Sequence, residues 1–372
     1  MGKKITIALF LVTIFTLSVV TFVAKDREFS EMENRTLSGK PEFSGEKLLA
    51  GEFADDLEKY LSDQLFMKDY FVMLKNSSDL ATGKDKLGGV YYVLGRYIRN
   101  FEENEEQVNK NLRFINNWID KNGLTEDKVS FVLAPTASYM YYDNLPDSNI
   151  SDKEDNTFSL VEEQFKGKFI SLKEAVGENS KTNHIYYRTD HHWTMEGAYY
   201  GYEEAMKQLG KEAVPLSSFK QVKLKEKFLG SLYSQAPLLG VGGEEVCFYD
   251  YKDLNYTVTY ETDGKEITSF LVEENFNVKD KYTALFGGNY GRLTITNNDN
   301  PDGEKLIVFK DSYANSFMPY LISHYSVIEV IDLRYTPMRQ GFYEDKTDYS
   351  VMFIYNTDFI NTDNNFVKLM GF

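Results

Sequence analysis

The chain has 372 residues, of which 42% are hydrophobic and 26% are charged, so its composition is that of a globular protein that is long for one hydrophobic core. The formal net charge is −16 and the sequence has no basic patch, which argues against nucleic acid as a partner. A single cysteine, Cys247, excludes an intrachain disulfide framework and a thiolate metal cluster. We therefore expect one main domain with a sizeable insertion or subdomain.

An uncharged apolar run extends from Ile5 to Ala24, directly after Lys3 and Lys4. Its length suits a membrane-spanning helix, which needs about 17–25 residues. A cleaved signal peptide has the same layout, but the bulky residues before Ala24 fit a cleavage site poorly, so we expect residues 1–24 to be an uncleaved signal anchor. The two lysines predict a cytoplasmic N-terminus. The protein would then be a single-pass protein of the cell membrane whose main domain is extracytoplasmic.

Residues 25–45 are polar and are interrupted by Pro41, and we interpret them as a stalk that joins the anchor to a folded region at 46–372. Residues 46–80 have apolar positions at helical spacing. The sequence then predicts a turn and a strand at 88–95, a helix at 102–122 that ends at Gly123, and a buried strand at 129–134.

A helical stretch is expected near residues 158–166, followed by a strand at 183–188. The motif Asp190-His191-His192-Trp193 comes directly after that strand. Thr194 is placed to cap a helix that ends at Gly210. The motif therefore lies on a loop between a strand and a helix, where open α/β sheets carry their chemistry.

Residues 216 to about 300 contain short alternating runs and a turn at Asp263-Gly264, a pattern typical of β-hairpins. We interpret this region as a β-rich insertion that roofs the site. The α/β pattern then returns, with strands expected at 306–309, 327–331 and 351–355 and a short helix at 314–323. The fold class predicted is α/β with a parallel sheet.

The chain has four histidines, and two of them, His191 and His192, follow Asp190 directly. A histidine that acts as a base needs an orienting carboxylate on one ring nitrogen and a nucleophile on the other. Ser312 is the best nucleophile candidate, because it follows a buried strand and precedes a helix whose first N–H groups favour negative charge. A serine at such a turn is also common as a simple helix cap.

Two further side chains have alternative roles. The His191-His192 pair raises the question of a metal site, but no cysteine lies near it and His184 would lie further back along the preceding strand, so we expect no metal. Arg334 fits either an ion pair with Asp332 or Asp311, or a contact with substrate.

Four segments together resemble the DHHW protein family over nearly the whole chain. That family is similar to SGNH-hydrolase-like proteins that O-acetylate alginate and other exported polysaccharides. The resemblance implies a circularly permuted, three-layer SGNH-hydrolase-like fold in which an Asp-x-His motif precedes the nucleophilic serine. The segments are Glu33-Asn34-Arg35-Thr36-Leu37, Thr189-Asp190-His191-His192-Trp193-Thr194, Phe309-Lys310-Asp311-Ser312-Tyr313-Ala314-Asn315-Ser316 and Asp332-Leu333-Arg334-Tyr335.

The same resemblance implies a role for each matching residue. Ser312 would be the nucleophile, His192 the base and Asp190 its orienter, while His191 would face away. Oxyanion or substrate contacts would come from the turn at Ser312 and from four further residues, namely Tyr313, Arg334, Asn356 and Asn289.

The function expected from this resemblance is transfer of an acetyl group, through an acyl-serine and without a cofactor, to hydroxyls of an exported polysaccharide. A multi-spanning membrane acyltransferase would supply the acetyl groups. Two alternatives stay open: an esterase with the same triad and water as acceptor, and a non-catalytic cell-surface assembly protein.

Overall fold

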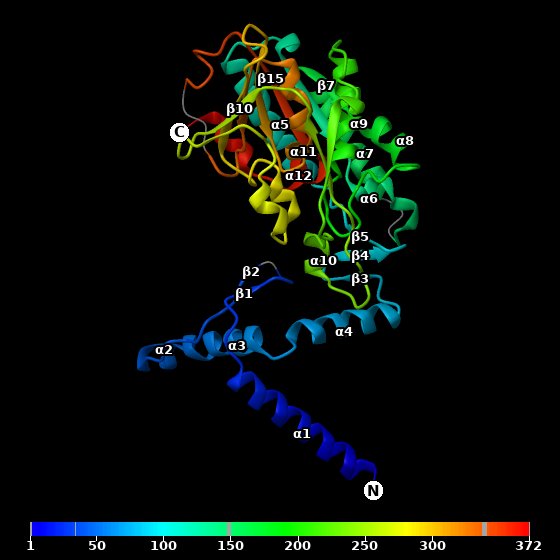
Figure 1. The fold of residues 1–372 in the computed structure, drawn as a ribbon, viewed down its shortest axis with the longest axis vertical. Helices are drawn as coiled ribbons and strands as arrows, with labels where there is room; N and C mark the ends of the chain where they lie inside the picture. Colours follow the sequence, from blue (N-terminus) through cyan, green and yellow to red (C-terminus); the bar gives the residue numbers. More distant parts are fainter. Residues whose placement is uncertain (1, 34, 147–149, 337–340, 372) are drawn as a thin grey trace. The chain divides into compact units, whose positions relative to one another are not determined.

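A computed structural model describes residues 2–33, 35–146, 150–336 and 341–371 (Figure 1). Asn34, part of the segment near the stalk that resembles the DHHW family, lies outside the described residues. The chain divides into two compact units. Met1–Gly88 with Tyr233–Val241 form the N-terminal unit, and Gly89–Leu232 with Gly242–Phe372 form the main unit.

The N-terminal unit is mostly helical. Its first helix, α1 (Gly2–Val23), is long and apolar enough to cross a membrane, with a mean hydropathy of 2.5. The predicted helical stretch at 46–80 consists of three helices, because Gly51 takes a φ of 84° between the first two and Met67 a φ of 60° before the third. The elements after α1 are β1 (Phe29–Ser30), β2 (Arg35–Thr36), α2 (Gly45–Ala50), α3 (Glu52–Gln64), α4 (Lys68–Ala81) and β3 (Lys86–Leu87).

The main unit is built on an eight-stranded sheet with the order β11-β10-β12-β14-β13-β15-β6-β7. The five strands from β14 to β7 are parallel, and the three at the other edge are antiparallel. The strands are β6 (Val129–Ala134), β7 (Lys168–Ser171), β10 (Tyr256–Tyr260), β11 (Glu266–Ile267), β12 (Arg292–Asn297), β13 (Lys305–Lys310), β14 (Val327–Ile331) and β15 (Tyr349–Asn356). Two antiparallel strand pairs lie outside this sheet, the hairpin of β4 (Val90–Val93) with β5 (Arg96–Arg99), and β8 (Phe219–Lys223) with β9 (Cys247–Tyr251).

Helices cover both faces of the sheet, and its central strands β6, β13 and β15 are buried on both sides. Leu306 and Val308 of β13 point into the core that holds α8, α9 and α11, whereas Ile307 and Phe309 point into the core of α5, α7 and α12. Successive side chains of a strand point to opposite faces of the sheet, so each face packs against its own set of helices and the unit has three layers. The helices are α5 (Glu105–Lys121), α6 (Ala137–Met140), α7 (Ile150–Gln164), α8 (Lys173–Ser180), α9 (Met195–Gln208), α10 (Ser231–Gln235), α11 (Ala314–Leu321) and α12 (Thr357–Thr362).

The strand expected at 183–188 is wrong. That segment is extended, but Tyr186 makes only an isolated bridge with Trp193. The bonds that its backbone makes go to the loop that follows and to Tyr97, as in Thr194 N–H to Ile185 C=O at 2.7 Å, and not to a strand of the sheet. The edge position of the sheet belongs instead to β7, a four-residue strand that the sequence pattern did not reveal.

The region at 216–300 is rich in β-strands, but it is not a separate layer. Its strands β10, β11 and β12 extend the main sheet as an antiparallel edge, and only β8 and β9 pair apart from it. After the predicted turn at Asp263-Gly264, the second strand of the hairpin is only the two-residue β11, and Phe270 and Leu271 beyond it are buried in the core.

Candidate active site

The ends of several parallel strands bring the predicted site residues to one edge of the sheet. Ser312 lies two residues beyond the end of β13, and Asn356 ends the neighbouring strand β15. The loop at 188–194 approaches the same edge, because Trp193 Nε1–H donates to the Tyr313 carbonyl at 2.9 Å. Thr194 then caps α9 as predicted, its hydroxyl accepting from the Gly197 N–H at 3.0 Å.

A continuous chain of hydrogen-bond distances joins three side chains. His192 Nε2 lies 2.8 Å from Ser312 Oγ, and His192 Nδ1 lies 2.6 Å from Asp190 Oδ1. Both distances are in the range that a nucleophile, its base and an orienting carboxylate require. Asp190 and His192 are buried, while Ser312 is half-buried.

Asp190 is held by more than the histidine. Its Oδ1 also accepts from the His192 N–H at 3.0 Å, and its Oδ2 accepts from the Ser231 N–H at 2.7 Å. Gly230 packs so closely against this carboxylate that a Cβ there would overlap it. Burial alone would raise the pKa of Asp190, but the charges of His191 and His192 and these hydrogen bonds hold the pKa well below its usual range. The carboxylate is therefore ionised and can stabilise an imidazolium.

An aromatic ring that the sequence did not single out lies on His192. Tyr282, from the β-rich region, stacks on the imidazole with 3.8 Å between ring centroids and 10° between planes. Its hydroxyl is 2.9 Å from Ser316 Oγ, which fixes the ring against α11. The β-rich region thus contributes directly to the site.

His191 does not contact Ser312 within the described chain. Its Nδ1 is 2.9 Å from Ser231 Oγ, and burial together with the charge of His192 lowers its pKa. Donor atoms of Asp190, His191 and His192 lie within 4.8 Å of one another, a spacing that a metal ion could use. Both oxygens of Asp190 and the Nδ1 of His191 already have partners in the protein, however, so an ion there would have to displace these bonds.

Two of the predicted oxyanion groups have partners of their own. The Tyr313 N–H donates to Asp311 Oδ1 at 2.8 Å, and Asn356 Nδ2 donates to Asp311 Oδ2 at 2.8 Å. Asn356 Oδ1 caps α12 by accepting from the Phe359 N–H. The Ser312 N–H, in contrast, has no acceptor at hydrogen-bond distance among the described residues. It is the group at this turn that remains open to an oxyanion.

Arg334 and Asn289 belong to a charged network behind the serine turn. Arg334 forms a bidentate ion pair with Asp332, at 2.9 and 2.6 Å. Of the two roles predicted for Arg334, this is the ion pair and not the substrate contact. Asp332 also lies 3.4 Å from the buried Lys310, which donates to Asn315 at 2.7 Å and to Asn289 at 3.3 Å. No described contact joins Arg334 or Asn289 to Ser312 or His192.

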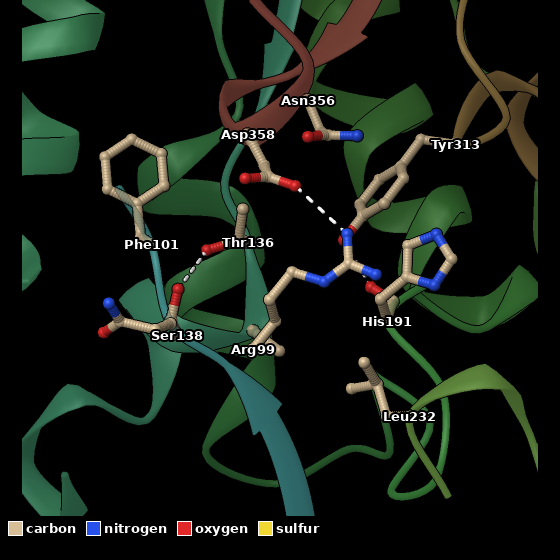
Figure 2. A pocket seen from close by; sticks show the side chains of 11 residues that line it. Arg99, Phe101, Thr136, Ser138, His191, Leu232, Tyr313, Asn356 and Asp358 are labelled. Carbon is tan, nitrogen blue, oxygen red and sulfur yellow. Dashed lines mark hydrogen bonds and ion pairs between the residues drawn. The ribbon is translucent and has the colours of Figure 1, made fainter. Parts of the chain in front are cut away.

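A pocket adjoins this site, with His191, Tyr313 and Asn356 in its wall (Figure 2). Across it, Arg99 faces Asp358 at 3.4 Å, and Ser138 Oγ lies 2.7 Å from Thr136 Oγ1 (Figure 2). No sequence pattern indicated Arg99, Ser138 or Asp358, because they come from β5, α6 and α12, which only the fold brings together.

Beneath the pocket, the fully buried Glu154 accepts from the Thr136 N–H and hydroxyl, at 2.7 and 2.8 Å. It also accepts from the Thr357 hydroxyl. Burial raises the pKa of Glu154 to about 7.

Comparison with solved structures supports the fold. A DHHW family protein from Eubacterium siraeum has a TM-score of 0.66 at 23% identity, over 77% of this chain and 96% of that one. PatB1 of Bacillus cereus, whose structure contains a sulfonyl adduct, has a TM-score of 0.62 at 20% identity, over 74% and 96% of the two chains. The O-acetyltransferase domain of Pseudomonas putida AlgJ has a TM-score of 0.45 at 12% identity, over 74% and 93% of the two chains. The first two matches and the sheet confirm the predicted SGNH-hydrolase-like α/β fold.

A comparison with curated protein sequences found no match. The family model for DHHW proteins matches residues 81–331, which contain the Asp190-His191-His192-Trp193 motif and Ser312. The chain belongs to the DHHW protein family.

Proposed function

We propose that this protein is an extracytoplasmic O-acetyltransferase that carries an acetyl group on Ser312 and passes it to hydroxyls of an exported polysaccharide. The observation that carries the proposal is the hydrogen-bond chain from Asp190 through His192 to Ser312, at 2.6 and 2.8 Å. A serine aligned with a base and an orienting carboxylate is the arrangement of enzymes that form acyl-serine intermediates.

In the first half-reaction, Ser312 Oγ attacks the acetyl carbonyl carbon while His192 Nε2 takes the hydroxyl proton. Asp190, paired to Nδ1, stabilises the imidazolium that forms. The Ser312 N–H is the open donor for the oxyanion, and one aligned donor is worth about 3–4 kcal/mol of transition-state stabilisation. The tetrahedral intermediate then expels the leaving group, which takes the proton from His192.

In the second half-reaction, a sugar hydroxyl attacks the acetyl-serine and gives its proton to His192. Collapse of the intermediate releases the acetylated sugar, and the proton returns to Ser312. Water at the same position would give an esterase instead. The resemblance of the DHHW family to polysaccharide O-acetyltransferases favours the sugar hydroxyl.

We propose that α1 remains as a signal anchor and that the main unit lies outside the cytoplasm. The length and apolar composition of α1 support this placement, as does the position of Lys3 and Lys4 at its N-terminal end. An acetyl donor would then have to be delivered on the outer side, and a multi-spanning membrane acyltransferase is the partner that could do so.

The test is product analysis with the full chain in detergent, supplied with an activated acetyl ester and a panel of oligosaccharides. The proposal predicts acetylated oligosaccharide, lost in Ser312→Ala and retained in Ser159→Ala, which alters an exposed serine of α7. Free acetate as the sole product across the panel would make the protein an esterase. No turnover of the ester by the intact protein would favour a non-catalytic role.

A further inference from the structure

The helix α4 exposes large apolar side chains along one face. Met67 directly precedes the first residue of α4, and Tyr70, Phe71 and Leu74 follow with the i, i+1, i+4 spacing that places residues on one side of a helix. Together with Phe66 they are exposed at 48, 43, 38, 42 and 42% respectively. An exposed face of a helix in a globular protein is ordinarily polar, so a continuous apolar stripe of this kind indicates a contact surface.

The stripe is not the face by which α4 packs in its own unit. On the opposite side, Asn76 is buried and donates to the Pro237 carbonyl at 3.1 Å. Met73 Sδ on the same side accepts from the Tyr233 hydroxyl at 3.6 Å. The apolar stripe is therefore a second surface of α4, separate from the face that packs within its own unit.

Specific bonds attach the beginning of α4 to the end of α1. The Phe66 N–H donates to Thr21 Oγ1, in the last turn of α1, at 3.1 Å. Just beyond α1, Arg27 and Gln64 exchange two hydrogen bonds of 2.9 Å, and Arg27 pairs with Asp69 at 3.0 Å. The apolar stripe thus begins where the apolar helix α1 ends.

We propose that this stripe, Phe66, Met67, Tyr70, Phe71 and Leu74, lies on the outer surface of the lipid bilayer that holds α1. The proposal rests on the membrane anchoring proposed above and is independent of the triad. A helix of 14 residues is about 21 Å long, too short to span the hydrocarbon core, but an amphipathic helix of this size suits the interface between headgroups and acyl chains.

The contact with the bilayer is apolar and not electrostatic. The five side chains of the stripe carry no charge, and the whole chain is acidic, with a net charge of −16. Attraction to anionic lipids would weaken as salt rises, whereas burial of apolar surface does not. The docking of α4 should therefore be independent of salt and should not need anionic lipid.

Fluorescence quenching in lipid nanodiscs tests this proposal with the full chain. In a Cys247→Ala background, Phe71→Cys, Phe15→Cys and Leu94→Cys each receive an environment-sensitive fluorophore, in nanodiscs of phosphatidylcholine. Phe15 reports on α1, and Leu94, 83% exposed in the main unit, is the matched exposed apolar control. We expect spin-labelled lipid to quench the probes at 15 and 71, and aqueous iodide alone to quench the probe at 94, at low and at high salt.

Quenching of the probe at 71 by iodide, as at 94, would overturn the docking of α4. Protection of that probe from both quenchers would also overturn it, since a second protein copy would then cover the stripe. Lipid quenching at 94 as well as 71 would mean unspecific adsorption and would overturn it too. If the probe at 15 is not quenched by lipid, the anchoring itself is wrong and the inference falls with it, whereas the acetyl-transfer assay is unaffected by any of these results.

Discussion

Replacing Asp190 by asparagine tests the part of the site that the structure defines best. The carboxylate accepts three N–H groups, two from His192 at Oδ1 and one from Ser231 at Oδ2. An asparagine side chain has one accepting atom, so at least one of these N–H groups must face an amide NH₂. The amide oxygen satisfies more donors when it faces His192, but it carries no charge to stabilise the imidazolium.

The expected loss follows from these two orientations. With the oxygen toward His192, only the charge is lost, and a hydrogen bond to a charged group is worth about 1.5–3 kcal/mol, or roughly 10–150-fold in kcat. With the NH₂ toward His192, the ring takes the wrong tautomer, and in serine proteases this lowers kcat by about 10⁴-fold. We therefore predict that Asp190→Asn lowers kcat by about 10- to 10⁴-fold with little change in KM.

Hydrolysis or transfer of an activated acetyl ester by the full chain measures this effect. The unsatisfied Ser231 N–H should also cost about 1–3 kcal/mol of stability, visible as a lower Tm. Asp63→Asn is the control, because Asp63 is a buried carboxylate paired with Arg35 in the N-terminal unit, so stability should fall while kcat stays constant. A loss of kcat below about threefold in a folded Asp190→Asn protein would refute the assignment of Asp190 as the orienter.

Three further predictions concern groups around the triad. Tyr282→Leu should lower kcat by about 2–12-fold, since an aromatic contact is worth about 0.5–1.5 kcal/mol, while Tyr282→Phe keeps the ring on His192 and should stay near the parent value in the same assay. Burial raises the pKa of Glu154 from 4.5 to about 7, so the folded state holds its proton more tightly than the unfolded state. The free energy of unfolding should therefore fall by about 3 kcal/mol as the pH rises from about 4.5 to about 7. Unfolding curves measured across this pH range should show this dependence in the parent protein and lose it in Glu154→Gln. Asp332→Asn leaves the buried Lys310 without its counter-charge, and the free energy of unfolding in a denaturant titration should fall by about 3–5 kcal/mol. Arg334→Gln removes only the ion pair with Asp332 and should leave KM unchanged. A large rise in KM would instead show that Arg334 contacts the substrate.

Local patterns predicted the central sheet well. The strands at 306–309 and 351–355 are uninterrupted apolar runs, as strands buried on both faces require, and those at 129–134 and 327–331 are apolar except for Ser130 and Glu329. The structure has all four as β6, β13, β14 and β15. The segment at 183–188 has a similar pattern but is wrong as a strand. Its apolar side chains are buried against α9 and the β-rich region, while its backbone bonds the following loop. Apolar patterning does not distinguish such a buried segment from a buried strand of the sheet.

The site was predictable only where its members are close in sequence or follow a strand. Asp190 and His192 are two residues apart, and Ser312 follows β13, so chain position alone indicated their common edge. Tyr282, Ser231 and Gly230 support them from a region with no regular pattern, where only tertiary contacts reveal a role. Chain position does not establish a role, however, because Asn356 lies at the expected strand end but its side-chain amide donates to Asp311.

The chemical reactivity of Ser312 tests the triad of Asp190, His192 and Ser312 most directly. The intact protein would be treated with a serine-directed sulfonyl fluoride, and the site of modification would be located by peptide mass spectrometry. We expect one adduct, on Ser312, that disappears in a folded His192→Ala variant because the serine loses its base. An unmodified Ser312 in the folded parent protein, or equal modification with and without His192, would contradict it.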